Sequence, residues 1–129
     1  MSEKLIEASQ AKVGTPILVD GVACIVKSND ISKTGKHGHA KCRIEAISVI
    51  DGKKKVFVVS GHERLERPII EKRKAQVLSI SDNKTSIIDS ESFETFEVIM
   101  PDELKSEIKE GNEVEYWIVQ NEKIIKKRL

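Results

Sequence analysis

Hydrophobic and polar residues alternate along the first half of the chain in short runs that predict β-strands. Val22, Cys24 and Val26 occupy every second position, as do Ile44, Ala46 and Ser48, which is the period of a strand with one buried face. Apolar residues of the opposite parity, such as Ile25 and Ile47, indicate strands that are covered in part on both faces. Short strands of this kind favour a compact barrel of SH3-like character. The predicted strands cover residues 17–20, 22–27, 40–50 and 55–60, with Asp-Gly turn pairs at 20–21 and 51–52.

The second half of the chain carries a second set of strand patterns. Charged residues crowd around Pro68 between Arg64 and Arg73, and proline favours a bend or an edge because it lacks an amide donor. We therefore place a domain boundary there, with one domain over residues 1–70 and another over 71–129. The strands predicted beyond it cover residues 75–81, 85–89, 93–99, 112–120 and 123–127.

One short helix is predicted between the third and fourth of these strands. Pro101 suits a first helical turn, two acidic residues follow it, and Gly111 is a plausible stop. Leu104 and Ile108 lie one turn apart on one face. Five strands with a helix before the last two match a five-stranded OB-fold barrel, so the predicted fold is mostly β, an SH3-like barrel followed by an OB-fold barrel.

Aromatic residues of the second half could serve an OB-fold in two ways. OB-folds bind single-stranded nucleic acid by stacking bases on exposed aromatics in a positive groove, but this half is acidic. Tyr116 and Trp117 are adjacent, so they face opposite sides of a strand and one of them is expected in the core. We favour a structural role over stacking for the aromatics, which are Phe93, Phe96, Tyr116 and Trp117.

Charge is distributed unevenly although the formal net charge of the 129 residues is only +1. Residues 1–70 carry 12 Lys or Arg and 8 Asp or Glu, and residues 71–129 carry 10 and 13, which together give the whole-chain totals of 22 and 21. A basic half in front of an acidic half would orient the molecule in the field of a polyanion.

Cysteine usage and hydropathy point to the cytoplasm. Cys24 and Cys42 lie in apolar strand-like runs, where a thiol behaves as a small hydrophobe, and two cysteines do not make a disulfide framework. A cross-strand bridge under oxidation is a minor alternative. No stretch approaches the roughly 20 apolar residues that span a bilayer. The first residues include Glu3 and Glu7 without the apolar core of a signal peptide.

The segment Ser32–Lys41 is the most informative part of the chain. Gly35 and Gly38 accept positive φ, and strand-like residues flank the segment on both sides, so we expect a hairpin with a wide loop. No carboxylate lies between Ile31 and Ile44, so the cations of this stretch repel one another without an acidic neighbour. Phosphates would supply the missing negative charge and relieve this repulsion. RNA is the expected partner of these cations, which are Lys33, Lys36, Lys41 and Arg43, with His37 and His39 as further candidates.

This segment, Ser-Lys-Thr-Gly-Lys-His-Gly-His-Ala-Lys, resembles the hypusine loop of the translation initiation factor 5A family in its short archaeal form. The family is related to bacterial elongation factor P. Weaker similarity covers most of the chain, including the junction at residues 64–68. The resemblance implies an N-terminal SH3-like domain of KOW type that carries the loop and a C-terminal OB-fold domain.

The resemblance also implies a modification at Lys36. In the family, deoxyhypusine synthase transfers an aminobutyl group from spermidine to this ε-amine, and a hydroxylation can follow; no separate cofactor is expected. The lengthened arm reaches the peptidyl-transferase centre of the large subunit beside peptidyl-tRNA and relieves stalling at sequences such as proline runs. The implied roles are loop positioning by Gly35 and Gly38, and contact with RNA or the modifying enzyme by Lys33, Thr34, His37, His39, Lys41 and Arg43.

Other chemistries fit these residues less well. A phosphate-binding P-loop fails at both ends, because Asp30 and His37 stand where a glycine and a hydroxyl residue are needed. A zinc site drawn from His37, His39, Cys42, Cys24 and His62 lacks paired cysteines at short spacing. An ordinary solvated basic turn would be the default interpretation of such a loop, and the ten-residue match outweighs it.

Three functions therefore remain in order of preference. The first is a non-enzymatic, monomeric translation factor with a modified Lys36. The second is an unmodified ribosomal or other RNA-binding protein whose hairpin grips phosphates. An enzyme is a distant third, because residues such as His62, Glu63 and Cys24 carry no local catalytic signature.

Overall fold

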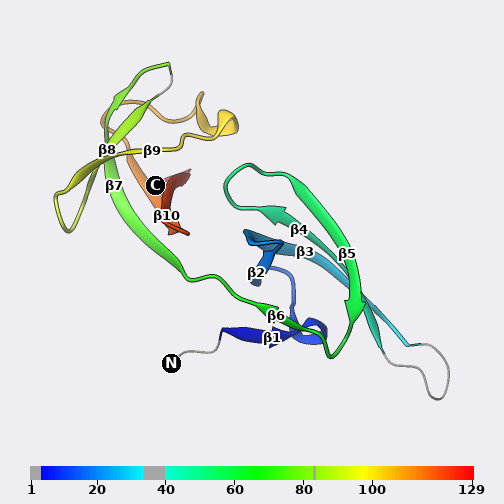
Figure 1. Ribbon diagram of the computed structural model, residues 1–129. Helices are drawn as coiled ribbons and strands as arrows, with labels where there is room; N and C mark the ends of the chain where they lie inside the picture. Colours follow the sequence, from blue (N-terminus) through cyan, green and yellow to red (C-terminus); the bar gives the residue numbers. More distant parts are fainter. Residues whose placement is uncertain (1–3, 34–39, 83) are drawn as a thin grey trace. The chain divides into compact units, whose positions relative to one another are not determined.

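The computed structural model describes residues 4–33, 40–82 and 84–129. It is mostly β, as the alternation predicts, and it divides into two compact units, Met1–Pro68 and Ile69–Leu129 (Figure 1). The boundary expected from the sequence, after Ile70, lies two residues further along the chain.

The first unit combines a four-stranded antiparallel sheet with a two-stranded ribbon. The sheet has the order β2-β3-β4-β5, and the ribbon pairs β1 with β6. The elements are β1 (Leu5–Glu7), the one-turn 3-10 helix η1 (Ala8–Gln10), β2 (Pro16–Val19), β3 (Val22–Ser32), β4 (Lys41–Ser48), β5 (Lys54–Ser60) and β6 (Arg64–Glu66).

Alternate residues of the central strands form the core of this unit. Cys24 and Val26 of β3 and Ile44 and Ala46 of β4 are fully buried, as their spacing predicts. Side chains from η1 and the ribbon cover them. The core consists of Ala8, Ala11, Ile17, Cys24, Val26, Cys42, Ile44, Ala46 and Leu65.

Strand β3 is longer than the sequence predicts. Its register with β4 shifts between Val26 and Ser28, which leaves Lys27 as an extra residue, and pairing then continues to Ser32 opposite Lys41. A bulge of this kind reverses which residues face the core. The apolar alternation that marks the first half of β3 therefore stops at Val26. The sequence pattern predicts a strand only over 22–27 and does not predict its polar continuation to Ser32.

The sequence pattern also does not predict the ribbon of β1 and β6. Leu5 lies opposite Glu66 and Glu7 opposite Arg64, so the two strands are joined by hydrogen bonds between distant parts of the sequence. Each is only three residues long, and Leu65 is its one buried core residue. Such short strands carry too little local pattern to be recognised.

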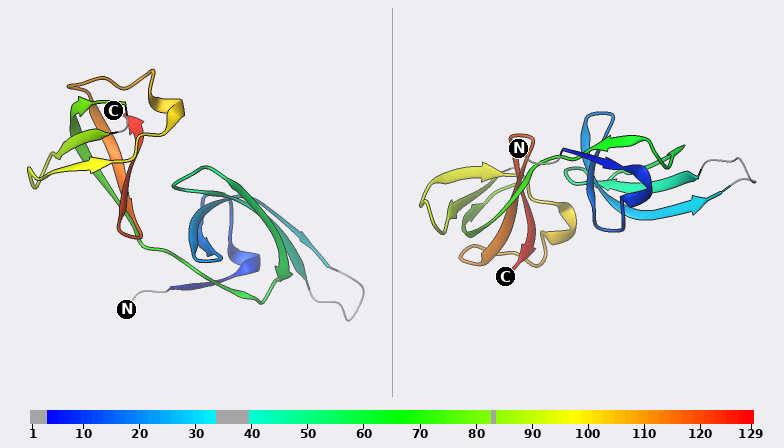
Figure 2. Two further views of the ribbon diagram at one scale, coloured as in Figure 1. Left: turned by 45° about the horizontal axis from the view of Figure 1, so that its top comes forward. Right: turned by 90° about the horizontal axis from the view of Figure 1, so that it is seen from below.

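The second unit is a five-stranded antiparallel sheet that curls toward closure. Its order is β11-β10-β7-β8-β9, and Figure 2 shows its curl from two further sides. Ile99, just after β9, forms a parallel bridge to Ile124 in β11. The amide of Ile99 donates to the Lys123 carbonyl at 2.9 Å. This barrel-like arrangement is the one predicted. The strands are β7 (Ile70–Ile80), β8 (Thr85–Asp89), β9 (Thr95–Val98), β10 (Glu113–Val119) and β11 (Glu122–Arg128).

The predicted helix is reduced to a single 3-10 turn, η2 (Asp102–Leu104). Pro101 precedes it with extended backbone, and Gly111 adopts a φ of +90° beyond it. Ile108 is buried and its amide donates to the Leu104 carbonyl at 3.1 Å. A segment this short cannot sustain a helix by propensity alone, so the packing of its apolar residues decides its path.

A buried carboxylate joins β8 to β10 inside the second unit. Tyr116 Oη donates to Asp89 Oδ2 at 2.5 Å, and the amides of Glu91 and Ser92 donate to Oδ1 at 2.8 and 2.9 Å. Burial raises the pKa of Asp89, but these hydrogen bonds and the nearby Arg73 outweigh it and hold the pKa at about 2. Asp89 is thus a charged core group whose lone pairs are satisfied.

Within the part of the chain that the structure describes, no helix has the length and apolar character needed to cross a membrane.

Candidate functional site

The predicted site lies at the end of the hairpin formed by β3 and β4. The two strands pair from Cys24 opposite Ser48 to Ser32 opposite Lys41, so the predicted hairpin is present (Figure 1). β4 also pairs with β5 along its length, up to Lys41 opposite Ser60, which makes β4 an internal strand. Six predicted site residues lie outside the described residues: Thr34, Gly35, Lys36, His37, Gly38 and His39.

Two of the predicted contact residues lie where the strands end. Lys33 directly follows β3 and Lys41 begins β4, and both are exposed. Both cations therefore lie at the loop end of the paired stem, where Ser32 is opposite Lys41, within reach of phosphates that approach the hairpin there. Their contact role stays a prediction.

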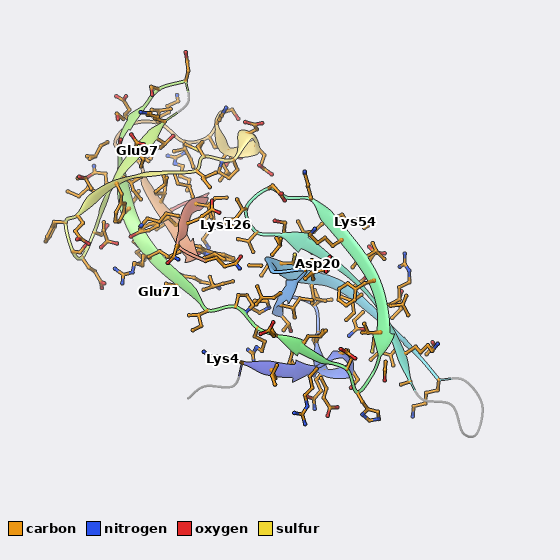
Figure 3. The ribbon with its side chains drawn as sticks, in the orientation of Figure 1. Lys4, Asp20, Lys54, Glu71, Glu97 and Lys126 are labelled. Carbon is orange, nitrogen blue, oxygen red and sulfur yellow. The ribbon has the colours of Figure 1, made fainter. Side chains whose placement is uncertain are left out.

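The third predicted contact residue, Arg43, already has an acidic partner. Its Nη1 donates to Glu45 Oε2 at 2.8 Å, and Lys54 Nζ lies 3.0 Å from Glu45 Oε1. Figure 3 shows Lys54 at the beginning of β5. The hydrogen bond from Arg43 and then that from Lys54 lower the pKa of Glu45. The guanidinium is therefore partly neutralised, although half of the Arg43 side chain remains exposed.

The expectation of a hairpin without acidic neighbours is therefore too simple. The stretch free of carboxylates ends at Ile44, one residue before Glu45, and Asp30 lies opposite Arg43 in the β3–β4 register. Residues two apart on a strand share a face, so the i, i+2 spacing of Arg43 and Glu45 could have revealed their pairing. The positive charge of the stem is consequently greatest toward Lys33 and Lys41.

The cysteines are free and buried, as predicted. Burial raises the pKa of both thiols. Cys24 lies opposite Ser48, whereas Cys42 lies opposite Ile31. Because Cys42 and Ser48 are six positions apart on β4, their separation is roughly 20 Å at about 3.3 Å per residue, far beyond disulfide reach. The alternative of a cross-strand bridge is wrong.

Metal chemistry finds no support among the described residues. They contain no group of three or more His, Cys, Asp or Glu side chains that could hold a metal ion. His37 and His39, which the zinc alternative requires, lie outside that part of the chain.

Three of the four aromatic side chains of the second unit are engaged within it, whereas Phe93 is 72% exposed, so the structural role expected of Phe93 finds no support in its burial. Tyr116 is fully buried, as one of the adjacent pair was expected to be, and its ring centroid lies 5.7 Å from that of Phe96. The Trp117 ring has Lys72 Nζ at 4.8 Å and Lys126 Nζ at 5.0 Å from its centroid. These cation–π contacts engage the ring within its own unit, and the structural role expected of Trp117 stays a prediction.

Comparison with known proteins places this arrangement in a family. The family model described as translation initiation factor 5A-like, N-terminal, matches residues 3–62. Translation initiation factor 5A of Methanosarcina barkeri is 44% identical over 111 residues, which cover 86% of this chain and 87% of that protein. The chain belongs to the translation initiation factor 5A family.

Further relatives extend the similarity over both units. Translation initiation factor 5A of Thermoplasma acidophilum is 44% identical over 117 residues, or 91% of each chain. The solved structure of eukaryotic translation initiation factor 5A from Methanococcus jannaschii matches with a TM-score of 0.88 and 35% identity, over 98% of this chain and 94% of that chain. The mostly β fold is thus that of the family, and the chain is a translation factor.

Proposed function

We propose that this translation factor acts through Lys36, modified to deoxyhypusine or hypusine, which it delivers to the ribosome beside peptidyl-tRNA to promote peptide-bond formation at stalling sequences. The observation that carries the proposal is the ten-residue loop match, borne on the two paired strands of β3 and β4 in a chain of this family. The modifying enzyme would be deoxyhypusine synthase, and the compartment the cytoplasm.

The proposed mechanism is positioning. Alkyl amines of the lysine type are protonated at neutral pH, so the lengthened side chain is a thin arm with two positive charges. Such an arm can enter an anionic channel of ribosomal RNA that a folded domain cannot. Holding reactants in an attack geometry contributes on the order of 7 to 11 kcal/mol in favourable cases, and no residue of this chain needs to make or break a bond.

The stem supports this role by its charge and stiffness. Two exposed cations lie at the loop end of the stem: Lys33 directly follows β3 and Lys41 begins β4. β4 is held between β3 and β5. A strand paired on both edges resists bending, so the loop is carried on a firm base.

Intact mass of the protein purified from its native host tests the modification. An aminobutyl gain that fragmentation localises to Lys36 is the expected result. An unmodified Lys36 would instead favour the second function, an RNA-binding protein that grips phosphates with the basic hairpin.

The variant Lys36→Arg tests the requirement for the arm, because it keeps the charge and removes the acceptor amine. We expect unchanged folding and loss of stimulated synthesis at proline runs. Lys27→Arg makes the same substitution at the exposed bulge of β3 and should keep activity. Full activity of Lys36→Arg would end the modified-arm proposal.

Salt dependence tests the contact surface. Phosphate contacts release counterions, so the affinity for ribosomes should fall steadily as salt rises. An affinity that is indifferent to salt would argue against the basic hairpin as the contact.

A further inference from the structure

The one-turn helix η1 and the residue that follows it are hydrogen-bonded to the β3 side of the hairpin through the side chain of Asn29. Asn29 Nδ2 donates to the carbonyl of Ala8 at 2.8 Å and to that of Ala11 at 3.0 Å. Both alanines are fully buried in the core. Because carbonyls only accept, the amide nitrogen must face them, and this fixes the orientation of Asn29.

The same helix is tied to the β4 side through Gly61. The Ser9 amide donates to the Gly61 carbonyl at 3.1 Å, and the Gly61 amide donates to the Ala40 carbonyl at 2.8 Å. Ala40 directly precedes β4. A Cβ at Gly61 would meet the Ala40 Cβ at 3.2 Å and the Ser9 Cβ at 3.6 Å, so this close approach favours glycine. We call the connected residues the stem clamp: Ala8, Ser9, Ala11, Asn29, Ala40 and Gly61.

The stem clamp acts where strand pairing on one edge of the hairpin ends. β2 pairs with β3 only as far as Pro16 opposite Ile25. After the bulge at Lys27, β3 continues to Ser32 with β4 as its neighbour in the sheet. Asn29 lies in the middle of this extension, so its two hydrogen bonds hold the strand where β2 no longer does.

Asn29 also lowers the stability of the fold in one respect. Its Oδ1 is buried without a hydrogen-bond partner among the described residues, and an unsatisfied buried acceptor is destabilising. The amide does, however, supply two directional hydrogen bonds, one to the first residue of η1 and one to the residue that follows the helix, which an apolar side chain cannot.

We propose that the stem clamp is a positioning device that fixes the direction in which the β3–β4 hairpin leaves the sheet, with Asn29 as its positioning residue. The inference rests on the proposed function, since the clamp sets the place from which Lys36 is presented. Asn29 precedes Ser32 by about 10 Å of strand, so a small tilt at the clamp is enlarged at the loop. Misplacement by about 1 Å can cost on the order of 100-fold in rate.

The direct test measures the geometry of the hairpin by electron–electron double resonance. Nitroxides are attached to Lys36→Cys and Lys53→Cys; Cys24 and Cys42 are fully buried and are not expected to react in the folded protein. Asn29→Asp keeps the side-chain shape but turns an acceptor toward two carbonyls. Asn29→Ala deletes the donor without adding charge and covers the case in which Asn29→Asp fails to fold. Asp30→Asn, on the opposite face of the same strand, is the matched control.

We expect both Asn29 variants to broaden the distance distribution between the labels, and Asp30→Asn to leave it unchanged. The functional readout uses unlabelled proteins whose Lys36 modification has been verified by mass. At saturating factor, the Asn29 variants should lower the rate of proline–proline bond formation at least tenfold, in line with the cost of misplacement, while Asp30→Asn retains the rate.

Two results would overturn the inference. One is a distance distribution that Asn29→Ala leaves as narrow as the wild type. The other is a broadened distribution with an unchanged rate. Failure of the proposed function is seen separately, as an unmodified Lys36 in wild-type protein, because the distance measurement requires neither the modification nor the ribosome.

Discussion

Removal of one hydroxyl from the core of the second unit should destabilise that unit strongly. Tyr116→Phe deletes the donor that reaches Asp89 Oδ2 at 2.5 Å, while the carboxylate stays buried with the amides of Glu91 and Ser92 on its other oxygen. A hydrogen bond to a charged group contributes about 1.5–3 kcal/mol. The pKa of Asp89, about 2 against an ordinary value of 3.8, reflects burial, two backbone amides and Arg73 as well as Tyr116, so the net shift confirms that Asp89 is ionised but does not measure the Tyr116 bond alone. We therefore expect Tyr116→Phe to lower the free energy of unfolding by about 2 kcal/mol.

The pH dependence of this loss follows from the sign of the shift. The folded-state pKa of Asp89 is depressed, so its contribution is complete above the unfolded value and is lost as the pH falls through about 2. Tyr116→Phe should raise the pKa of Asp89, because burial remains and one donor is gone. The difference between wild type and variant should therefore be largest near neutral pH and shrink between about pH 4 and 2.

Urea unfolding followed by tryptophan fluorescence measures this difference, because the chain has a single tryptophan, Trp117, on a strand of the same unit. A unit of this size should also melt roughly 8–16 °C lower. Ser92→Ala is the matched control: it removes an exposed hydroxyl that accepts from the Glu94 amide at 3.3 Å and should cost less than about 0.5 kcal/mol. A loss in Tyr116→Phe as small as the control's, or one that persists undiminished at pH 2.5, would refute the reasoning.

Three further predictions concern the first unit. Glu45→Gln removes the carboxylate that neutralises Arg43, so ribosome binding should tighten several-fold at low salt and lose this gain at high salt; equal affinity in a sedimentation assay would contradict it. Burial raises the pKa of the Cys24 and Cys42 thiols, so a chromogenic disulfide reagent should react with them only on unfolding, and rapid reaction of the native protein would show the prediction wrong. Ile44→Ala empties a fully buried position and should lower the free energy of unfolding by about 2–5 kcal/mol, measured by circular dichroism in urea; a loss below about 1 kcal/mol would be inconsistent with its place in the core.

Much of the strand framework could be predicted because its signals are local. Asp20-Gly21 and Asp51-Gly52 end strands where positive φ is required, and the structure has that φ at Asp20, Gly21 and Gly52. Alternation identified the buried residues of β4, and adjacency alone separated Tyr116 from Trp117. The candidate site was likewise identified from contiguous residues, since a loop motif is contained in one stretch of chain.

The features that were missed depend on residues distant in sequence. The ribbon of β1 and β6 exists because each strand supplies the other's hydrogen bonds. Neither strand has enough apolar residues to be recognised from its own sequence pattern. The bulge at Lys27 moved Asn29 onto the core side of β3, where the carbonyls of η1 meet it. Nothing in the local pattern around Asn29 distinguishes it from a solvated polar residue.

The amino-acid sequence by itself determined the kind of elements, the position of the loop and the family, because periodicity, turn chemistry and a contiguous motif are properties of neighbouring residues. Only the tertiary structure decided that Arg43 shares Glu45 with Lys54, that Asp89 is a charged core residue bound to Tyr116, and that η1 joins both sides of the hairpin. These contacts bring together groups from separate strands, and the free energy of such a group depends on its burial and its partners, which exist only once the sheets have closed.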